Sequence, residues 1–408
     1  MSINKSIDQY IDTIGQEPVD RIKELAERLL DSTITHINST RSGGGVAEIL
    51  QNLVPLARSL GLKVRWQSIG GTIDFFNITK KFHNALQGMN IKLTKEMKIK
   101  YIKYNEKFSE NLDLDSDVVF IHDPQPLPII KFNRDKCKKF LWRCHLDLTN
   151  ANTTYWNFII KFVEKYDALV FSLDKYVHKD VRHKKILIVP PSIDPLSNKN
   201  RTLSPEEVYQ TLTKFDVNPE YPIMTQVARF DYWKDPLGVI DCYKIVKKKI
   251  PKIQLLMIGS FAQDDPEGQK WYQKTIQKAQ NFRRIHVLTD KDGVGDLEVN
   301  AFQRASTVVV QKSIREGFGL SVTEALWKGT PVVATRVGGI PLQVINNVTG
   351  YLVNTTKECA DRTIYLIKHQ YLGKILGMEG REHIKRNFLI TRHLEDYLKL
   401  HLEIIEPN

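Results

Sequence analysis

The sequence predicts an α/β protein built from two parallel sheets, each flanked by helices. Short apolar runs alternate with amphipathic stretches along the chain, as expected when parallel strands are joined by covering helices. The alternation falls into two blocks, and a proline-containing segment at 190–195, followed by a polar segment at 197–205, forms the expected interdomain connector. Because 408 residues exceed one ordinary hydrophobic core, two domains are expected.

Each block is predicted to contain a series of strands and one clearly marked helix. In the first block the helix is expected at 46–60, closed by Gly61, because glycine readily adopts the left-handed backbone conformation that ends helices. In the second block the helix at 236–249 carries apolar residues at helical spacing and ends in three lysines, which the helix dipole favours there. The expected strands are 35–38, 63–67, 118–122, 139–144 and 168–172 in the first block, which ends near 186–191, and 223–228, 254–258, 285–288, 307–311 and 331–335 in the second.

The charge pattern argues against a nucleic-acid-binding protein. The formal net charge is +12, but 47 acidic residues are interspersed with 59 basic ones along most of the chain. The longest basic run is the end of the expected helix at 236–249, where a solvated helix end explains it. A net positive potential favours the approach of a small anionic substrate, an effect that salt screens.

Cysteine usage and hydropathy indicate a soluble protein of a reducing compartment. The four cysteines show neither paired spacing nor a metal-ligand pattern, so buried thiols are expected. No apolar stretch approaches the roughly eighteen residues that a membrane-spanning helix needs. The protein is therefore expected to be cytoplasmic, without a membrane partner.

Two glutamates eight positions apart, Glu316 and Glu324, bracket a glycine-containing turn between an expected strand and a helix. Gly317 and Gly319 allow close backbone approach, and the free amides at the start of the helix can receive an anion. One carboxylate beside such a turn and one behind it would suit a nucleotide sugar, which has hydroxyls at both ends and phosphate between. The alternative is a first-turn helix acid and a solvated loop residue.

The glycine loop 42–48 follows the first expected strand and opens a helix, which raises the question of a dinucleotide-binding fingerprint. The match is poor, because Glu48 stands where a third glycine belongs and the next strand ends without an acid to hold a ribose. Two interpretations stay open. The amides around Gly44 and Gly45 approach a phosphate or a sugar, or the loop is a tight turn packed against its own helix.

Two further loops of the first block follow expected strands, at the edge where doubly wound sheets bind ligands. The loop 122–126 contains Asp123 and Gln125, and the loop 145–149 contains His145 and Asp147. These side chains can bind sugar hydroxyls, although a lone histidine is more often a structural hydrogen-bonding group. No histidine and carboxylate cluster has metal-ligand spacing, and the acidic stretch 113–117 is expected to be a solvated turn.

In the second block, Arg229 and Lys234 share one short loop between a strand and a helix. When a sugar leaves a nucleoside diphosphate, negative charge grows on the phosphate, and two fixed cations can stabilise it without a metal. The alternative is surface pairing with Asp231 and Asp235, worth about 0–1 kcal/mol. The nearby Glu316 loop favours the first interpretation.

Together these residues resemble the retaining glycosyltransferases of the GT-B fold, in which two acids separated by seven residues are a familiar signature. More narrowly, the chain resembles the trehalose glycosyltransferring synthases, over about residues 33–390. The narrower resemblance rests on the segments 38–40 with 43–48, 75–88 (FFNITKKFHNALQG), 122–126, 142–147, 229–236 and 292–306 (DGVGDLEVNAFQRAS).

The resemblance implies two Rossmann-like, doubly wound domains that face a deep interdomain cleft. The N-terminal acceptor-binding domain would span 1–200 and the nucleotide-sugar-binding domain 201–385, with a C-terminal helix, 386–408, packing back on the N-terminal domain. The roles implied by the resemblance are catalytic for Arg229, Lys234, Glu316 and His145, donor-binding for Glu324, Gly317, Phe318, Gly319, Leu320, Ser321, Val287, Leu288, Gly44 and Gly45, and acceptor-binding for Asp123, Gln125 and Asp147.

The activity implied by the resemblance is transfer of glucose from ADP- or UDP-glucose to the anomeric hydroxyl of glucose, giving α,α-trehalose with retained configuration. No cofactor is expected, and any stimulation by Mg²⁺ would act without a dedicated protein site. The expected partners are these small molecules and a second copy of the chain in a homodimer, with no nucleic acid. The alternatives are a retaining trehalose phosphorylase that uses glucose 1-phosphate, and a non-catalytic nucleotide-sugar sensor.

Overall fold

The computed structural model describes residues 5–42, 44–182, 185–261 and 267–406. These residues form two compact units. Unit 1 contains residues up to Ser192 together with the C-terminal segment from Ile390. Unit 2 contains the intervening part of the sequence, from Ile193 to Leu389. The unit boundaries therefore lie at 192/193 and 389/390, whereas the sequence placed the domain boundaries at 200/201 and 385/386.

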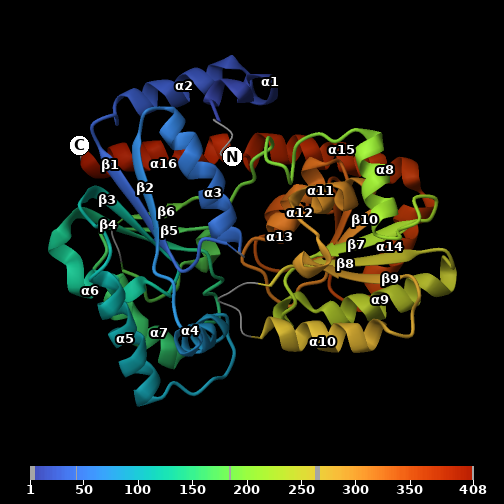
Figure 1. The fold of residues 1–408 in the computed structure, drawn as a ribbon, viewed down its shortest axis with the longest axis horizontal. Coiled ribbons are helices and arrows are strands. Elements are labelled where there is room, and N and C mark those ends of the chain that lie inside the picture. Colours follow the sequence, from blue (N-terminus) through green and yellow to red (C-terminus); the bar gives the residue numbers. More distant parts are fainter. Residues whose placement is uncertain (1–4, 43, 183–184, 262–266, 407–408) are drawn as a thin grey trace. The chain divides into compact units, whose positions relative to one another are not determined.

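Unit 1 is a six-stranded parallel sheet with helices against it (Figure 1). The strand order is β2 (Lys63–Ser68), β1 (Thr33–Asn38), β3 (Ser116–His122), β4 (Cys137–Cys144), β5 (Ala168–Phe171) and β6 (Ile186–Ile188). Its α-helices are α1 (Ile11–Ile14), α2 (Gln16–Glu27), α3 (Gly45–Ser59), α4 (Ile73–Leu86), α5 (Lys95–Ser109), α6 (Ile130–Asn133), α7 (Thr153–Val163) and α16 (Ile390–Ile405). Its 3₁₀ turns are Ile7–Tyr10, Leu127–Ile129, Arg134–Lys136 and Asp174–Tyr176.

Unit 2 repeats this architecture with a second six-stranded parallel sheet. The strand order is β12 (Gly350–Val353), β11 (Val332–Thr335), β10 (Val308–Gln311), β7 (Ile223–Val227), β8 (Gln254–Gly259) and β9 (Ile285–Thr289). Its α-helices are α8 (Pro205–Lys214), α9 (Pro236–Lys249), α10 (Gly268–Ala279), α11 (Asp296–Ala305), α12 (Leu320–Trp327), α13 (Ile340–Gln343), α14 (Thr356–Lys368) and α15 (Gln370–Asn387). Its 3₁₀ turns are Tyr232–Lys234 and Asp290–Asp292.

The sheet of unit 2 is buried on both faces, which explains why its strands are nearly continuous apolar runs. In β8, Leu255 and Met257 pack into one core with helix α9, while Leu256 and Ile258 pack into the opposite core with Val299. Successive strand residues point to opposite faces, so each strand contributes to both cores. The sequence therefore alternates apolar strands with amphipathic helices because the sheet is buried between two layers of helices.

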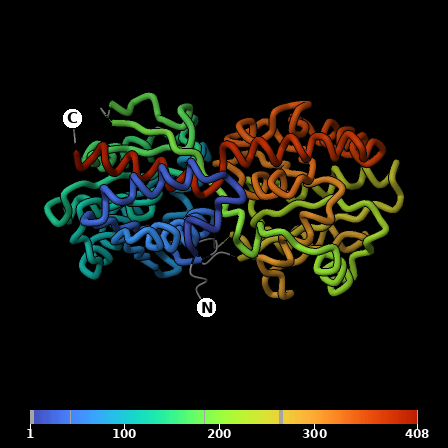
Figure 2. The backbone as a smooth tube through the Cα atoms, turned by 90° about the horizontal axis from the view of Figure 1, so that it is seen from above, coloured from blue at the N-terminus to red at the C-terminus, as the bar shows by residue number. Residues whose placement is uncertain are grey.

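Helix α16 belongs to unit 1 although it is the last element of the chain. It lies beside α2, and Figure 2 shows the red C-terminal helix running along the blue N-terminal helices. Its buried face includes Leu394, Tyr397 and Leu398, while Arg28 forms an ion pair with Glu406 at 2.8 Å. The two ends of unit 1's sequence are held together by these contacts.

Most elements expected from the sequence are confirmed, and three expectations are wrong. Strand β12 was not expected, because a four-residue run carries too little periodicity to mark a strand. The acidic stretch 113–117 is not simply a solvated turn, since Asp117 lies in β3 and forms an ion pair with Lys138 at 2.5 Å. The expected connector at 197–205 is an ordered part of unit 2: Asn200 is buried and its carbonyl accepts a hydrogen bond from Trp327 Nε1 at 3.1 Å.

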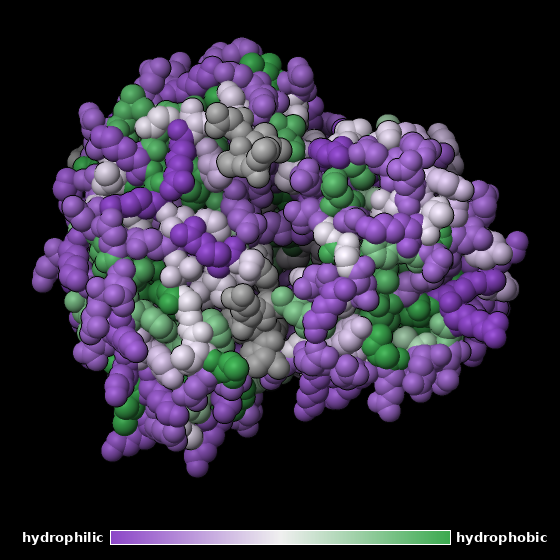
Figure 3. Space-filling model, viewed as in Figure 1, coloured by the Kyte–Doolittle hydropathy of each residue, from purple (hydrophilic) through white to green (hydrophobic). Residues whose placement is uncertain are grey.

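The cysteines and the surface agree with the composition. All four cysteines are free thiols; Cys144, Cys242 and Cys359 are buried and Cys137 is partly buried. On the face shown in Figure 3, hydrophilic residues cover most of each unit, and hydrophobic residues are scattered among them. None of the helices in the described ranges is long and apolar enough to cross a membrane.

Candidate functional site

Each sheet has one topological switch point, and these positions locate the candidate site loops. In unit 2 the chain runs from β7 outward to β9 and then returns to the other side of β7 as β10. In unit 1 the corresponding point lies between β1 and β3. Ligands of doubly wound sheets bind at the carboxyl ends of the strands beside such a point, because the two adjacent loops diverge there.

In unit 2 the switch point brings the Lys234 loop and the Glu316 loop into contact. Lys234 Nζ lies 2.5 Å from Glu316 Oε1, and the other carboxylate oxygen accepts hydrogen bonds from Ser313 Oγ at 3.0 Å and Gln311 Nε2 at 3.4 Å. Glu316 is only 6% exposed, and the Lys234 side chain is 17% exposed. Glu316 is therefore a buried, oriented carboxylate, and the alternative of a solvated loop residue is wrong.

The turn between Glu316 and helix α12 is fixed by backbone contacts. Gly339 N donates to Gly317 O at 3.2 Å, and the Gln343 side-chain amide donates to Phe318 O at 2.5 Å. Phe318 is buried and its ring packs against that of Phe388. Gly319, at φ +90°, stands directly before α12, and no side chain in the described part of the chain caps the first amides of this helix. The amides of the first turn, which include Leu320 and Ser321, can therefore receive an anion.

Gly319 offers a test of how this turn holds Glu316. A Cβ at Gly319 would lie 3.2 Å from Glu316 Cγ, in a backbone conformation that other residues rarely adopt. Gly319→Ala is expected to cost about 1–2 kcal/mol of stability from backbone strain and also to displace the Glu316 carboxylate. Donor binding, followed by calorimetry, should weaken.

Gly329→Ala is the matched control for this substitution, because Gly329 lies at the other end of α12 with φ +74°. A Cβ there would meet no atom closer than 4.0 Å. This variant should show a comparable loss of stability with unchanged donor binding. Equal loss of binding in both variants would show that backbone strain alone, and not displacement of Glu316, weakens the site.

Glu324 lies one turn inside α12 and is 1% exposed, so its alternative interpretation as an ordinary first-turn helix acid is also wrong. Its Oε1 atom lies 3.0 Å from Lys199 Nζ. Lys199 comes from the segment that the sequence assigned to a connector, and no local pattern marked it as a partner of Glu324. The contact depends on the packing of this segment against the carboxyl end of α12, where Lys328 Nζ also binds Asn200 Oδ1 at 2.9 Å.

The alternative interpretation of the Arg229 loop, surface pairing with Asp231 and Asp235, is only partly present. Arg229 Nη2 lies 4.0 Å from Asp231 Oδ2, the outer limit of an ion pair. Lys234 does not pair with its neighbour Asp235; Asp235 caps helix α9 through Gly238 N at 3.0 Å and forms an ion pair with Lys312. Lys312 is a cation of this loop cluster that sequence reasoning missed, because it follows β10 without a motif of its own.

Val287 and Leu288 lie in β9, the edge strand of the unit 2 sheet. Both are partly buried, and they point to opposite faces: Val287 packs against the core that contains Leu255, and Leu288 packs against the core that contains Leu256. A flat ligand at this edge can therefore contact at most one of these side chains face on, together with the backbone of both.

In unit 1 the glycine loop and the 122–126 loop meet the carboxyl edge at the switch point. Gly43 lies outside the described residues. Gly44 stands directly before α3 with no side-chain cap, and Gly45 is the first residue of this helix. A Cβ at Gly44 would meet no atom within 4 Å, so packing of the turn against its own helix does not explain glycine at this position.

Two acidic side chains of unit 1 are oriented by local hydrogen bonds. Asp123 adopts a left-handed conformation, φ 65°, and its Oδ1 accepts a hydrogen bond from His145 N at 2.7 Å. Asp147 is buried and accepts from Thr149 N at 3.0 Å. Gln125 Oε1 is buried without a hydrogen-bond partner among the residues that the structure describes. Asp123 and His145 are thus brought together, across two neighbouring strands.

His145 lies at the end of a row of histidines. Its Nε2 is 3.2 Å from His122 Nδ1, and His122 Nε2 is 3.1 Å from His36 Nδ1. His393 and His401 of α16 are buried nearby, with Ser192 and Ser32 as respective hydrogen-bond partners. Burial lowers the pKa of all five rings, to about 3 for His36 and about 4 for His401, so each is neutral in the folded protein at neutral pH.

These buried neutral rings predict a loss of stability in mild acid. Above pH 6.5 each ring is neutral in both the folded and the unfolded chain, so its contribution to stability is fully present. As the pH falls below 6.5 the unfolded chain binds protons that the folded protein excludes, and stability falls by about 1.4 kcal/mol per pH unit for each ring. For His401 this loss continues until the pH reaches its folded pKa of about 4.

His401→Gln isolates one of these rings, because glutamine can still bind Ser32. The free energy of unfolding, measured with urea at a series of pH values between 6.5 and 4, should fall less steeply with decreasing pH than in the wild type. The difference in this pH dependence should correspond to one proton. Between pH 7 and 8 the difference in unfolding free energy between the two proteins should stay constant. An unchanged slope in acid would mean that His401 is protonated in the folded protein.

The described ranges contain no group of three or more histidine, cysteine or acidic side chains arranged to hold a metal ion. What the geometry brings together in unit 2 is a buried carboxylate, a lysine bound to it, an uncapped helix N-terminus and a second buried glutamate. This set can bind an anionic ligand that also carries hydroxyl groups.

The fold and the comparisons with known proteins define the class. Residues 210–387 match the family model described as glycosyl transferases group 1. The structure is similar to a sucrose-phosphate synthase from Thermosynechococcus elongatus, with a TM-score of 0.71 at 16% identity, covering 92% of this chain and 100% of that chain. The chain is a glycosyltransferase with two Rossmann-like units, the GT-B fold.

Sequence similarity narrows this class. Residues 36–178 match the model described as trehalose synthase, N-terminal domain. The chain is 52% identical to a trehalose synthase of Thermococcus litoralis over 398 residues, which cover 97% of this chain and 96% of that protein. A trehalose phosphorylase of Pleurotus pulmonarius is 27% identical over 85% of this chain and 54% of its own length. The chain belongs to the trehalose synthase family.

Proposed function

We propose that the protein is a retaining glucosyltransferase that moves glucose from a nucleoside diphosphate glucose, such as ADP- or UDP-glucose, to the anomeric hydroxyl of a second glucose, forming α,α-trehalose. The observation that carries the proposal is the contact between Lys234 and the buried Glu316 beside the uncapped start of α12. This arrangement suits a ligand with phosphate next to a sugar. The 52% identity to a protein named trehalose synthase supports trehalose as the product.

Unit 2 binds the donor in this proposal. Lys234 has three ammonium hydrogens, and only one is needed for Glu316, so the others are available to the diphosphate. Arg229 and the first amides of α12 complete the phosphate site. The remaining donor contacts are proposed as Glu316 with the glucose hydroxyls, Gly317 and Phe318 with the sugar through their backbone, Glu324 with the ribose, and the edge near Val287 and Leu288 with the base.

The proposed reaction is a front-face displacement. The bond between the glucose anomeric carbon and the diphosphate oxygen breaks, and the leaving nucleoside diphosphate takes the electron pair. The acceptor hydroxyl forms the new bond on the same face and passes its proton to a phosphate oxygen. Lys234 and Arg229 stabilise the charge that grows on the leaving phosphate, which is the step that fixed cations accelerate most. No protein nucleophile is required.

Unit 1 is proposed to bind the acceptor and to contribute His145 to the donor glucose. Asp123, Gln125 and Asp147 present carboxylate and amide oxygens that can accept hydrogen bonds from sugar hydroxyls. The amides around Gly44 and Gly45 are open to a ligand, since nothing packs where a side chain would stand at Gly44. His145 is held by its backbone bond to Asp123 and its ring contact with His122.

The proposed reaction needs no resident metal, because cationic side chains and helix amides supply the charge that a metal would otherwise provide. A chelator such as EDTA should therefore leave transfer active, even if added Mg²⁺ stimulates it by binding the free nucleotide. Complete loss of activity in EDTA, restored by a metal, would contradict this part of the proposal.

A panel of donors tests the proposed function and separates it from the alternatives. Purified protein is incubated with glucose and, in parallel, ADP-glucose, UDP-glucose or glucose 1-phosphate, and trehalose is quantified by chromatography. We expect trehalose from at least one nucleotide sugar and none from glucose 1-phosphate. Trehalose from glucose 1-phosphate alone would identify a phosphorylase, an outcome consistent with the distant phosphorylase relatives. Binding of the nucleotide sugars without product would identify a sensor.

A further inference from the structure

Three histidines form a continuous row across three neighbouring strands of unit 1. His36 lies in β1, His122 ends β3, and His145 follows β4; these strands are adjacent in the sheet. The register pairs His36 with Phe120 and His122 with Arg143, which places the rings on one face of the sheet. The ring nitrogens are 3.1 Å apart between His36 and His122 and 3.2 Å apart between His122 and His145.

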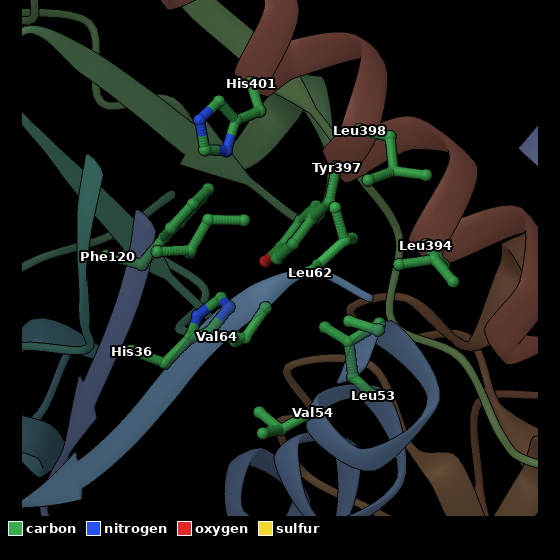
Figure 4. A pocket seen from close by; sticks show the side chains of 12 residues that line it. His36, Leu53, Val54, Leu62, Val64, Phe120, Leu394, Tyr397, Leu398 and His401 are labelled. Carbon is green, nitrogen blue, oxygen red and sulfur yellow. The ribbon is translucent and has the colours of Figure 1, made fainter. Parts of the chain in front are cut away.

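Helix α16 covers the same face and closes the far end of this histidine row. His393, Tyr397 and His401 recur every fourth residue, so they lie along one side of the helix. His36, Tyr397 and His401 line a cavity of about 20 Å³ whose other walls are mainly apolar, and Figure 4 shows the His36 and Tyr397 rings facing it from the strand and the helix. A cavity of this size holds at most about one water molecule. The row therefore runs from a small, mainly apolar cavity to the candidate sugar-binding residue His145.

Neutral imidazoles in such a row determine one another's tautomers. Burial keeps all three rings neutral, and a neutral imidazole has one N–H and one bare nitrogen. Each ring-to-ring contact needs one N–H and one bare nitrogen, so both hydrogen bonds must run in the same direction. Once the tautomer of His36 is set, those of His122 and His145 follow.

The cavity favours one direction of the row. Buried N–H groups without a partner are rarer in proteins than buried acceptors without one. At the mainly apolar cavity, His36 is therefore better placed with its Nε2 bare and its Nδ1–H donating to His122. His122 then donates to His145 Nε2, which leaves the proton of His145 on Nδ1. Among the residues that the structure describes, His145 Nδ1 has no hydrogen-bond partner.

We propose that His122 and His36 are positioning residues that hold His145 in the Nδ1–H tautomer, so that His145 presents a hydrogen-bond donor to an oxygen of the donor glucose. The role of His145 toward glucose rests on the proposed function, whereas its tautomer does not. Loss of the row would leave the His145 ring free to exchange between tautomers, one of which presents a bare nitrogen to the sugar. The contribution is therefore to orientation and not to proton transfer in the reaction.

The test is nitrogen NMR of the histidine side chains in the full chain, combined with kinetics. Protein labelled with ¹⁵N-histidine should show His145 with a protonated Nδ1 and a bare Nε2 in the wild type. His122→Phe removes both ring contacts, and the His145 signals should move to values averaged between the two tautomers. With the nucleotide sugar as donor, kcat/KM should fall about 10- to 100-fold, by analogy with the loss seen when a residue that orients a metal-ligating histidine is removed. Binding of the nucleoside diphosphate alone should stay unchanged.

His36→Phe and His401→Gln complete the design. His36→Phe removes the last ring of the row, which does not contact His145. This variant should also shift the His145 signals, and it replaces His122→Phe in the test if His122→Phe does not fold. His401→Gln, which alters the same cavity but lies outside the row, should leave the His145 signals and kcat/KM unchanged.

Unchanged His145 signals in a folded His122→Phe or His36→Phe protein, or a bare Nδ1 in the wild type, would overturn the proposal. Shifted signals with kcat/KM preserved would also overturn it, because the row would then orient a ring that the reaction does not use. If the wild type transfers glucose from no nucleotide sugar, the proposed function fails. The nitrogen spectra would still decide whether the row fixes the tautomer.

Discussion

Arg229→Ala and Lys234→Ala are each expected to lower turnover about 100- to 1000-fold, the usual cost of removing one group that stabilises charge growing in a transition state. In the proposed reaction this charge grows on the leaving diphosphate. The two residues lie in one loop at the topological switch point of unit 2, where Lys234 is already oriented by its 2.5 Å contact with Glu316. Steady-state kinetics with a saturating nucleotide sugar measures the effect directly.

Stability separates the two substitutions. Arg229 is partly exposed and its Nη2 lies 4.0 Å from Asp231 Oδ2, the outer limit of an ion pair, and exposed pairs of this kind contribute about 0–1 kcal/mol. Lys234→Ala leaves the buried Glu316 carboxylate without its cation, which should cost about 1–3 kcal/mol. We therefore expect Arg229→Ala to lose less stability than Lys234→Ala, and the free energy of unfolding of each purified variant shows whether its loss of turnover arises from unfolding.

Lys278→Ala is the matched control for Lys234→Ala. Lys278 also belongs to unit 2 and lies on helix α10, outside the loops of the switch point. It forms a 2.6 Å ion pair with Asp241. It should lose little stability and no turnover. If purified Arg229→Ala and Lys234→Ala are as active as the wild type, the assignment of these two residues to the leaving group is refuted.

Glu316→Gln is expected to lower kcat/KM for the nucleotide sugar about 100-fold, with a small loss of stability. Glutamine has nearly the same shape and can still accept the hydrogen bond from Ser313, but it carries no charge for Lys234 or for the glucose hydroxyls. Hydrogen bonds in which one partner is charged are about twice as strong as neutral ones. The substitution should therefore weaken the interaction with the glucose part of the donor.

Calorimetry can separate the two parts of the donor. The nucleoside diphosphate alone should bind Glu316→Gln about as well as it binds the wild type, while the nucleotide sugar binds more weakly. Glu298→Gln is the control, because Glu298 also forms a 3.0 Å ion pair with a lysine of unit 2, Lys214, and lies on helix α11. Activity of Glu316→Gln within threefold of the wild type would remove Glu316 from the proposed site.

Individual elements show how far the sequence could predict the fold. Helix α9 has the predicted bounds, because Asp235 and Pro236 mark its start and apolar residues recur at helical spacing up to the three lysines. Strand β10 was recognised from its run of valines. Strand β12 was missed because its four residues form a strand only by pairing with β11, and such pairing is not visible in local sequence.

The candidate site likewise contains residues that the sequence indicated and residues that it did not. The two-glutamate turn, the Arg229 loop and His145 were identified because each follows a recognisable strand and carries residue types with known chemistry. Lys199, Lys312 and His36 were missed as site neighbours, and His122 was noted only as the first residue of the 122–126 loop, without its histidine partners. Each of these residues contacts a partner on another strand or segment. The sequence around a single lysine or histidine does not indicate which distant residue it will contact.

By itself, the sequence determined the two α/β blocks and the loops that carry the candidate site, since hydrophobic periodicity and turn residues are local properties. Only the tertiary structure decided which charges meet. Lys234 binds Glu316, 82 residues away, while its neighbour Asp235 binds Lys312 and caps a helix. The physical reason is that β7 and β10 are adjacent in the sheet, and adjacency of strands is fixed by the packing of the whole unit, which no short stretch of residues specifies.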